Sequence, residues 1–430
     1  MTIPLLKLNS KSVTGRIAVG AAILTALVFI WLGVRWQVGN MLAELTSPNR
    51  DDALGVGNLA AGLSPNDPLP RWLIAAKQKQ LFSPESTESS IINFGETVRL
   101  APHDFRWWIE LGRAFEQAER PVDAEKALTR AVELAPSYTF PRWQLGNFYL
   151  RQNRTEEAFA ELKKTTEMSA VYRNQVFSLA WDYFGKDPRK VEELAIDTPS
   201  TKPSLVLFYA ARSSPKDALR IWNTLADEQK ESNKQTAKEA AFILAGKFFF
   251  NEAAEFARQS GRDPDVKPGA VTNGDFEGPL AASEESLFGW KVNRAEGRAD
   301  SSIDSSVKHG GARSLKTTFR NFEKPTIYTL LQHVALEPLG RYRLNFWVRT
   351  ENLKSGGPPL LEIANCTNDK VLAASDPFPA GSNDWKEMTV EFTVPEQCSG
   401  VVLKTARVFC GEDCPLIGTF WYDDFNLVRQ

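Results

Sequence analysis

The sequence predicts an α region followed by a β region: one transmembrane helix, an α-solenoid of paired helices, and a β-sandwich of jelly-roll type. Three observations support this order. They are an uncharged apolar run at residues 17–34, a 34-residue repeat within residues 71–260, and short alternating strands over residues 269–430. A chain of 430 residues can form two or three domains that each bury a core.

The overall charge argues against one class of partner. The chain has 51 Lys and Arg against 53 Asp and Glu, which gives a formal net charge of −2, and it contains no long basic run. Nucleic-acid binding depends on clustered basic side chains that neutralise phosphates. We therefore expect no nucleic-acid partner.

The apolar run is 18 residues long, at the short end of what crosses a bilayer as a helix. Lys7, Lys11 and Arg16 precede it, and positive residues favour the cytoplasmic side. We therefore expect residues 1–16 in the cytoplasm and residues 17–34 as a single-pass anchor in the inner (cytoplasmic) membrane. The rest of the chain then lies on the periplasmic, extracytoplasmic side.

A cleaved signal peptide is the alternative to an anchor. The apolar run is long for a signal peptide, Arg35 and Trp36 follow it, and no clear small-residue cleavage site is present. Residues 35–70 are expected to form a juxtamembrane linker, after a helical continuation to Leu45, because Gly, Pro and Asn are frequent from Leu54 onward.

The repeat defines the helical region. Gly112 and Gly146 lie 34 residues apart, and so do Ala124 and Ala158. Small residues at these places let antiparallel helices approach closely, and larger residues fill the space to the next pair. The clearest copy resembles the tetratricopeptide repeat at Trp108, Leu111, Gly112, Phe115, Ala124, Leu128, Ala131 and Pro136. We expect roughly five helical pairs over residues 71–260, the last two degenerate.

The resemblance implies a concave groove for a protein partner, formed by recurring positions on the first helix of each pair. Mixed aromatic and basic residues suit an extended peptide or a partner's helix. The candidate groove residues are Trp72, Lys79, Phe82, Arg106, Arg113, Phe140, Trp143 and Asn147. The alternative is that Phe140 and Trp143 pack between neighbouring pairs.

Residues 269–430 contain strand-like segments such as SLKTTF, YRLNFWVRT and EMTVEFTV, separated by Gly, Pro and Asn. The opening VTNGDFEGPL and the closing FWYDDFNLV resemble the carbohydrate-binding-module jelly rolls of the galactose-binding-like superfamily. Such modules share a fold more than a ligand, so the resemblance implies a sandwich and leaves the sugar open.

A sugar site needs an aromatic face and hydrogen-bonding groups. Strand alternation puts Tyr342, Leu344 and Phe346 on one face of YRLNFWVRT and the polar side chains with Trp347 on the other. The candidate glycan-binding residues are Tyr328, Gln332, Asn345, Trp347 and Arg349. Trp290 is expected in the core. The alternative for Trp347 is packing under a loop.

The same resemblance implies a structural calcium ion held by Glu277 and Asp424 near the two ends of the sandwich. Calcium prefers hard oxygen ligands such as carboxylates and backbone carbonyls. The alternative is that both are solvated strand-end residues.

All four cysteines, Cys366, Cys398, Cys410 and Cys414, lie in the sandwich region. Their number indicates two disulfides and an oxidising compartment. Sequence alone allows three pairings; we predict Cys366–Cys398 and Cys410–Cys414. The alternative is four reduced, buried thiols.

The sequence shows no motif of a known enzyme class. The three histidines, His103, His309 and His333, stand in no metal-binding or nucleophile context. We expect a non-catalytic envelope protein: a repeat scaffold for a protein partner with a glycan-binding sandwich. The combination of domains resembles accessories of surface or exopolysaccharide assembly and export. The alternatives are a purely structural scaffold whose sandwich binds protein, and a carbohydrate-active enzyme without recognisable motifs.

Overall fold

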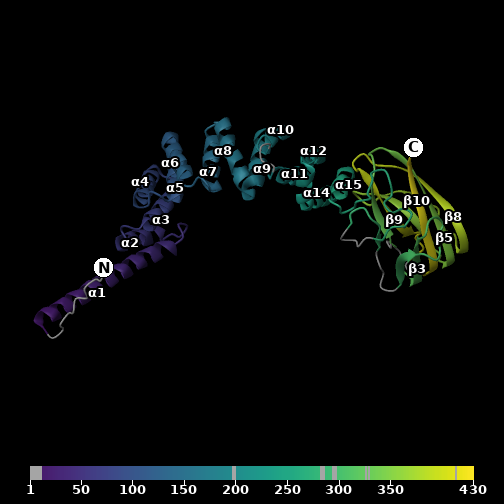
Figure 1. The fold of residues 1–430 in the computed structure, drawn as a ribbon, viewed down its shortest axis with the longest axis horizontal. Helices are drawn as coiled ribbons and strands as arrows, with labels where there is room; N and C mark the ends of the chain where they lie inside the picture. The colour runs from purple at the N-terminus through teal and green to yellow at the C-terminus, as the bar shows by residue number, and fades with distance from the viewer. Residues whose placement is uncertain are drawn as a thin grey trace, which may run out of the picture. The chain divides into compact units, whose positions relative to one another are not determined.

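A computed structural model describes residues 12–195, 200–280, 286–292, 298–324, 327, 330–411 and 414–430. Among these residues, the helices lie between residues 13 and 259, and antiparallel strands follow them (Figure 1). The chain divides into two compact units, Met1–Val176 and Phe177–Gln430, and the boundary falls within helix α9. The last helices therefore belong to the same unit as the sandwich.

The first helix, α1 (Val13–Glu44), continues well past the predicted span. It is long and apolar enough to cross a membrane, and none of its most apolar 18-residue window is buried against the rest of the protein. Ser12 begins the helix, because its hydroxyl accepts a hydrogen bond from the Gly15 amide at 3.0 Å. The positive residues Lys7 and Lys11 lie outside the described residues.

The expected helical continuation to Leu45 is confirmed, because α1 ends at Glu44. The expected loop from Leu54 onward is wrong, because this stretch is largely helical. Residues 53–63 form α2 (Ala53–Leu63), which packs against the last turns of α1. Gly39 permits this approach, because a Cβ there would lie 2.9 Å from the Ala60 carbonyl oxygen. The small residues of this stretch, which was expected to be a loop because of its Gly, Pro and Asn, instead supply a close helix–helix contact.

Helices follow in pairs along the chain, with a short turn between the two helices of a pair. Each pair corresponds to one copy of the repeat. The pairs are α3 (Pro68–Lys79) with α4 (Pro84–Leu100), α5 (Phe105–Gln117) with α6 (Pro121–Leu134), α7 (Thr139–Arg151) with α8 (Thr155–Met168), α9 (Arg173–Tyr183) with α10 (Pro188–Glu192), α11 (Lys202–Ala211) with α12 (Pro215–Asn223), and α14 (Lys234–Gly246) with α15 (Phe250–Gln259). The short helices η1 (Ala170–Tyr172) and α13 (Asp227–Ser232) are connectors.

The turn inside a pair is built the same way in several copies. Glu119, Asn153 and Ser213 each have a positive φ, and the next amide donates to the carbonyl five residues earlier. Arg154 N, for example, donates to Tyr149 O at 2.9 Å. This is the Schellman arrangement that closes a helix C-terminus. The repeat is therefore visible in backbone geometry as well as in sequence.

The predicted small positions lie where two helices of a pair meet. A Cβ on Gly112 would lie 2.8 Å from Leu128 Cγ, and one on Gly146 would lie 2.9 Å from Leu162 Cγ. Ala124 and Ala158 are fully buried. These residues form the tetratricopeptide-type contact that the 34-residue spacing predicted.

In the described residues, the C-terminal domain is a sandwich of two five-stranded antiparallel sheets, ordered β1-β4-β9-β6-β7 and β2-β3-β10-β5-β8. The strands are β1 (Lys291–Val292), β2 (Ala299–Asp304), β3 (Ser314–Phe322), β4 (Leu330–Ala335), β5 (Arg341–Lys354), β6 (Pro359–Asn365), β7 (Val371–Ala374), β8 (Gly381–Thr393), β9 (Gly400–Arg407) and β10 (Leu416–Arg429). The core between the sheets contains Phe346, Phe420 and Tyr422.

Helix α15 docks onto the first sheet within the same unit. Phe250 N donates to Ser399 Oγ at 2.6 Å, and Asn251 Nδ2 donates to Leu336 O at 3.2 Å. The Phe250 ring meets the His333 ring at 5.3 Å between centroids. The last helical pair is therefore fixed on the sandwich by both polar and apolar contacts.

Candidate functional site

Three tryptophans from adjacent strands share the outer face of the sheet β2-β3-β10-β5-β8. Trp421 belongs to β10, Trp347 to β5 and Trp385 to β8. The neighbours of Trp421 and Trp347 along their strands lie in the core, so these two indoles point away from it. We call the surface formed by these three tryptophans and by His309, which packs on Trp347 and Trp385, the tryptophan face.

The loop between β2 and β3 crosses this face and covers part of it. Its His309 ring stacks on Trp347, with centroids 3.9 Å apart and an angle of 16° between planes. The same imidazole meets Trp385 edge-on at 5.6 Å, and Trp385 Nε1 donates to Lys308 O at 3.1 Å. One ring face of Trp347 is therefore occupied by the protein itself.

Carboxylates from the first and last segments of the sandwich hold this loop. Asp423 Oδ2 accepts from the amides of His309 at 2.8 Å and Gly310 at 3.2 Å. Glu277 Oε1 accepts from the amides of Ala312 and Arg313. Asp423 is fully buried, and burial raises the pKa of its carboxyl. The loop is thus built into the sandwich by backbone hydrogen bonds.

Charged side chains cover Trp421, which is only 2% exposed. Lys316 Nζ lies 5.4 Å from its ring centroid, and its indole Nε1 donates to Asp304 Oδ2 at 2.9 Å. Burial alone would raise the pKa of Asp304, but hydrogen bonds from Ser306 and Trp421 outweigh it and hold the pKa at about 2. Asp304 therefore stays ionised beside the Lys316 ammonium, 3.8 Å away.

The structure separates the five glycan candidates. Asn345, Trp347 and Arg349 lie on the outer face, in the alternation expected for β5. Gln332 is wrong as a ligand-facing residue: it is fully buried between the sheets, where its Nε2 donates to Thr272 O at 2.8 Å. Tyr328 lies outside the described residues. Trp290 is buried in the core, as predicted.

The two calcium candidates contact the same loop, residues 308–313, although Glu277 comes near the start of the domain's sequence and Asp424 near its end. Asp424 Oδ2 lies 2.7 Å from His309 Nδ1, and Glu277 accepts from the amides three and four residues further on. Backbone hydrogen bonds lower the pKa of Glu277 and keep it ionised. Among the described residues, no group of three or more His, Cys, Asp or Glu side chains is arranged to hold a metal. A cation here would depend on loop carbonyls as its further ligands.

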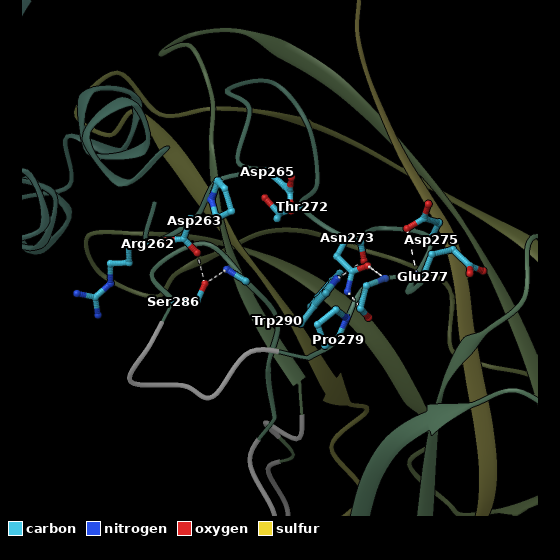
Figure 2. A pocket seen from close by; sticks show the side chains of 13 residues that line it. Arg262, Asp263, Asp265, Thr272, Asn273, Asp275, Glu277, Pro279, Ser286 and Trp290 are labelled. Carbon is cyan, nitrogen blue, oxygen red and sulfur yellow. Dashed lines mark hydrogen bonds between the residues drawn. The ribbon is translucent and has the colours of Figure 1, made fainter. Parts of the chain in front are cut away.

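A hollow separate from the tryptophan face lies where the chain passes from α15 into the sandwich (Figure 2). Its volume is about 510 Å³, and its walls include Asp263, Asn273, Ser286 and Trp290. Asp263 binds Ser286 Oγ and the Leu287 amide, and Trp290 Nε1 donates to Asn273 O at 3.0 Å. These hydrogen bonds hold the wall of the hollow in place. We therefore interpret the hollow as part of the structural connection between α15 and the sandwich.

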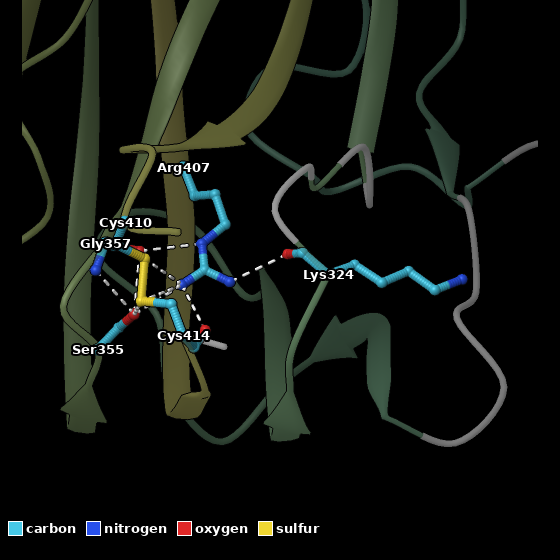
Figure 3. Close-up of a disulfide and its surroundings, with 6 residues drawn as sticks. All are labelled: Lys324, Ser355, Gly357, Arg407, Cys410 and Cys414. Atoms are coloured by element: carbon cyan, nitrogen blue, oxygen red, sulfur yellow. Dashed lines mark hydrogen bonds between the residues drawn. A yellow bond between two sulfur atoms is a disulfide. The ribbon is translucent and has the colours of Figure 1, made fainter. Parts of the chain in front are cut away.

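Both predicted disulfides, Cys366–Cys398 and Cys410–Cys414, are present. Arg407 lies against the second one (Figure 3). Its Nη2 is 3.2 Å from each of the Cys410 and Cys414 sulfurs and donates to Cys414 O at 2.8 Å. Burial lowers the pKa of this guanidinium. Arg407 also donates from Nε to Gly357 O, so it joins the disulfide turn to the end of β5 and the start of β6.

The partner-groove candidates fall into two groups. Lys79 and Arg113 come together on Glu110, at 2.8 Å and 3.2 Å, so they form a network across two pairs. Trp143 packs on Tyr172, with ring centroids 5.5 Å apart. This contact agrees with the alternative that Trp143 packs between neighbouring helical pairs. Asn147 donates to the Trp143 carbonyl.

The remaining candidates differ in exposure. Trp72 packs against Trp107 at 6.1 Å. Phe82 lies in the turn after α3, with a positive φ, and is 78% exposed, so its assignment to a helix face is wrong. Arg106 pairs with Asp104 and borders an open hollow of about 810 Å³. Phe140 is 41% exposed.

Sequence reasoning missed four members of the tryptophan face and its surroundings: His309, Trp385, Trp421 and Asp304. The alternation in FWYDDF could have placed Trp421 opposite the core-facing Phe420 and Tyr422. No sequence pattern indicates that His309 stacks on Trp347, because 38 positions separate two residues that only the fold brings together.

Comparisons with known proteins agree with the two parts of the chain. Residues 269–406 match the family described as "Carbohydrate binding domain". No curated protein shows significant similarity to the chain. The sandwich is thus of carbohydrate-binding-module type, and the paired helices before it are of tetratricopeptide type, as the sequence predicted.

Solved structures similar to single parts of the chain include three examples. "MamA 41-end from Desulfovibrio magneticus RS-1" is 23% identical, with a TM-score of 0.27, and the match covers 32% of this chain and 75% of that one. "CBM4 structure and function" is 16% identical, with a TM-score of 0.28, covering 37% and 99%. "Crystal structure of YrrB: a TPR protein with an unusual peptide-binding site" is 13% identical, with a TM-score of 0.25, covering 48% and 92%.

Proposed function

We propose that this protein is a membrane-anchored, non-catalytic scaffold that binds a glycan through the tryptophan face and a protein partner through its helical repeats. The observation that carries the glycan part is the gathering of Trp347, Trp385 and His309 beside charged side chains on one sheet face. Aromatic rings pack on the C–H groups of a pyranose, and adjacent polar groups bind its hydroxyls.

The groups available to a ligand are those at the β5–β8 side of the face. Arg349 is partly exposed and lies 3.8 Å from the carboxylate of Asp384, which is itself exposed. Trp385 is partly exposed beside them. A sugar ring on Trp385 would have the guanidinium of Arg349 and the Asp384 carboxylate as hydrogen-bonding partners. This corner therefore replaces Trp347 as the principal stacking platform in our proposal.

We assign the protein partner to the helical repeats because they are of tetratricopeptide type and because they have an open surface. The hollow beside Arg106 is lined by the Arg106–Asp104 ion pair and by the Phe105 and Tyr138 rings, which lie 5.4 Å apart. Such a surface suits an extended peptide segment of a partner.

The location follows from the anchor. We propose that α1 crosses the inner membrane with residues 1–16 in the cytoplasm, and that the repeats and sandwich lie on the periplasmic side. Two disulfides in the sandwich are consistent with an oxidising compartment. In this location the protein would serve surface or exopolysaccharide assembly or export, by holding a polymer near a protein complex.

One observation favours a second function. His309 covers a ring face of Trp347, so part of the tryptophan face is already closed. In a purely structural scaffold, the sandwich would bind a protein through the same exposed charged side chains and would need no exposed aromatic ring.

Binding of purified polysaccharides to the full-length protein in lipid nanodiscs separates the two functions. Saturable binding of at least one polysaccharide, with no change in its chain length, supports the proposal. Cleavage of the polymer would contradict the non-catalytic assignment. A structural scaffold would bind none of the polymers.

A structural calcium ion at Glu277 and Asp424 is a further proposal. It is supported by the convergence of both carboxylates on the loop of residues 308–313. When bound, calcium would tie the first and last segments of the sandwich to this loop.

A further inference from the structure

An apolar hollow of about 260 Å³ lies between the last helical pair and the sheet β1-β4-β9-β6-β7, within one unit of the chain. Its wall includes four phenylalanines, Phe242, Phe248, Phe250 and Phe288. The Phe250 ring meets the rings of Phe248 and Phe288, with centroids 6.5 Å and 6.0 Å apart. Phe242 of α14 is 64% exposed, so the hollow is open to solvent beside this helix.

Among the described residues of this wall, Lys291 of β1 and His333 of β4 carry the polar groups. The imidazole of His333 is hydrogen-bonded to the Leu287 backbone. Lys291 is half-buried, and no carboxylate of the part of the chain that the structure describes lies within ion-pair distance of its ammonium. The ammonium of Lys291 is therefore the polar group that remains available to a ligand in this hollow.

The surroundings of Lys291 favour an anion. Burial lowers the pKa of its ammonium, and the charge of Asp263 compensates this effect only in part. Asp263 is itself hydrogen-bonded to Ser286 Oγ and to the Leu287 amide. A carboxylate that reached Lys291 would restore the missing negative charge, and the pair would be stronger in this half-buried place than on an open surface.

The volume of the hollow limits the apolar part of the ligand. A dry cavity of about 150 Å³ lined by apolar side chains accommodates one benzene molecule. A hollow of about 260 Å³ therefore has room for one ring, or an alkyl chain of similar size, with a short arm. The phenylalanine rings of the wall offer faces and edges on which such a body can pack.

We propose that this hollow binds a small apolar carboxylate, with its apolar body against Phe242, Phe250 and Phe288 and its carboxylate on the ammonium of Lys291. The inference goes beyond the proposed function, and it holds whether or not the sandwich binds a glycan. Both parts of the ligand contribute: the phenylalanines remove the body from water, and the ammonium pairs with the charge. A neutral molecule of the same shape would leave Lys291 without its counter-ion.

Equilibrium dialysis of radiolabelled 3-phenylpropanoate with the full-length protein in nanodiscs at neutral pH tests the site, and empty nanodiscs correct for uptake by lipid. A ligand of about eleven non-hydrogen atoms should bind once per chain, with a Kd between about 10 μM and 1 mM. The uncharged 3-phenylpropanamide should bind about tenfold more weakly to wild type. Absence of saturable binding, or equal affinities of the acid and the amide, would overturn the proposal without any variant.

Two variants separate the contributions of charge and apolar wall. Lys291→Met should weaken binding of the acid about tenfold and leave binding of the amide unchanged. Phe242→Ser, at an exposed position of α14, should weaken binding of both compounds alike, by about threefold to tenfold.

The control is Phe409→Ser, which removes a 75% exposed ring elsewhere on the sandwich and should bind both compounds as wild type does. Melting temperatures show that the variants are folded. An acid affinity that Lys291→Met leaves unchanged would overturn the proposal. Equal losses in Phe242→Ser and Phe409→Ser would indicate nonspecific adsorption to exposed rings and would overturn it as well.

Discussion

Acid should loosen the joint between the last helical pair and the sandwich, because His333 is held there in its neutral form. Burial, with a smaller contribution from the nearby Lys291 charge, lowers the pKa of His333 from 6.5 to about 4. Its ring contacts Phe250 of α15 and lines an apolar hollow of about 260 Å³ with Phe242 and Phe288. An imidazolium would be poorly solvated in these surroundings.

The pKa shift sets the sign and the size of the effect. A histidine whose pKa is lowered by folding contributes stability above the unfolded pKa of 6.5 and loses it as the pH falls toward about 4. The whole shift is worth about 3 kcal/mol, of which about 2 kcal/mol is lost between pH 7 and pH 5. His333→Leu should abolish this part of the acid sensitivity.

Urea denaturation of the full-length protein at the two pH values measures the effect. The loss of unfolding free energy on acidification should be about 2 kcal/mol smaller in His333→Leu than in wild type. His103→Leu, which removes a histidine from an exposed loop and keeps His333, should retain the wild-type loss. Equal losses in wild type and His333→Leu would refute the reasoning.

Further predictions follow from the repeat and from the loop on the sandwich. Gly146→Ala should lower the free energy of unfolding by about 1–3 kcal/mol, because the new Cβ meets Leu162. Gly95→Ala, in open space on α4, should raise it by about 0.5–1 kcal/mol. Thermal melts compare the two variants, and equal effects would contradict the close contact at Gly146. If calcium binds, it should raise the melting temperature, and Glu277→Gln but not Asp275→Asn should remove the rise; no rise in wild type would refute the site. Mass mapping without reductant should find Cys366–Cys398 and Cys410–Cys414 linked, and free thiols would contradict the oxidising compartment.

Much of the fold was predictable because its signals are local or periodic. The 34-residue spacing of Gly112 and Gly146 reports a contact within each helical pair, and strand alternation reports which side of β5 faces the core. The helix α2 was missed because the Gly, Pro and Asn residues from Leu54 onward suggested a loop, whereas packing against α1 stabilises Ala53–Leu63 as a helix despite its glycines.

The site was less predictable because it depends on contacts between distant segments. Gln332 was misplaced because it lies on the core-facing side of β4, between Leu330 and Val334, so its polarity did not indicate exposure. Lys316, Asp304 and Trp421 form one cluster from three strands, and nothing in their separate segments indicates that they meet. Trp347 lies on the outer face as predicted, and the loop of residues 308–313 covers one of its ring faces, as the stated alternative of packing under a loop expected.

The central claim is that the sandwich binds a glycan at the tryptophan face. Isothermal titration of full-length protein in nanodiscs with a polysaccharide that binds wild type tests it most directly. Trp385→Ala should weaken binding by roughly 1–3 kcal/mol, about tenfold to a hundredfold. Arg349→Gln should weaken it less, through one lost donor. Phe409→Ala, which removes an exposed aromatic elsewhere on the sandwich, should bind as wild type does. Unchanged affinity in Trp385→Ala and Arg349→Gln, with the fold intact by melting temperature, would contradict the account.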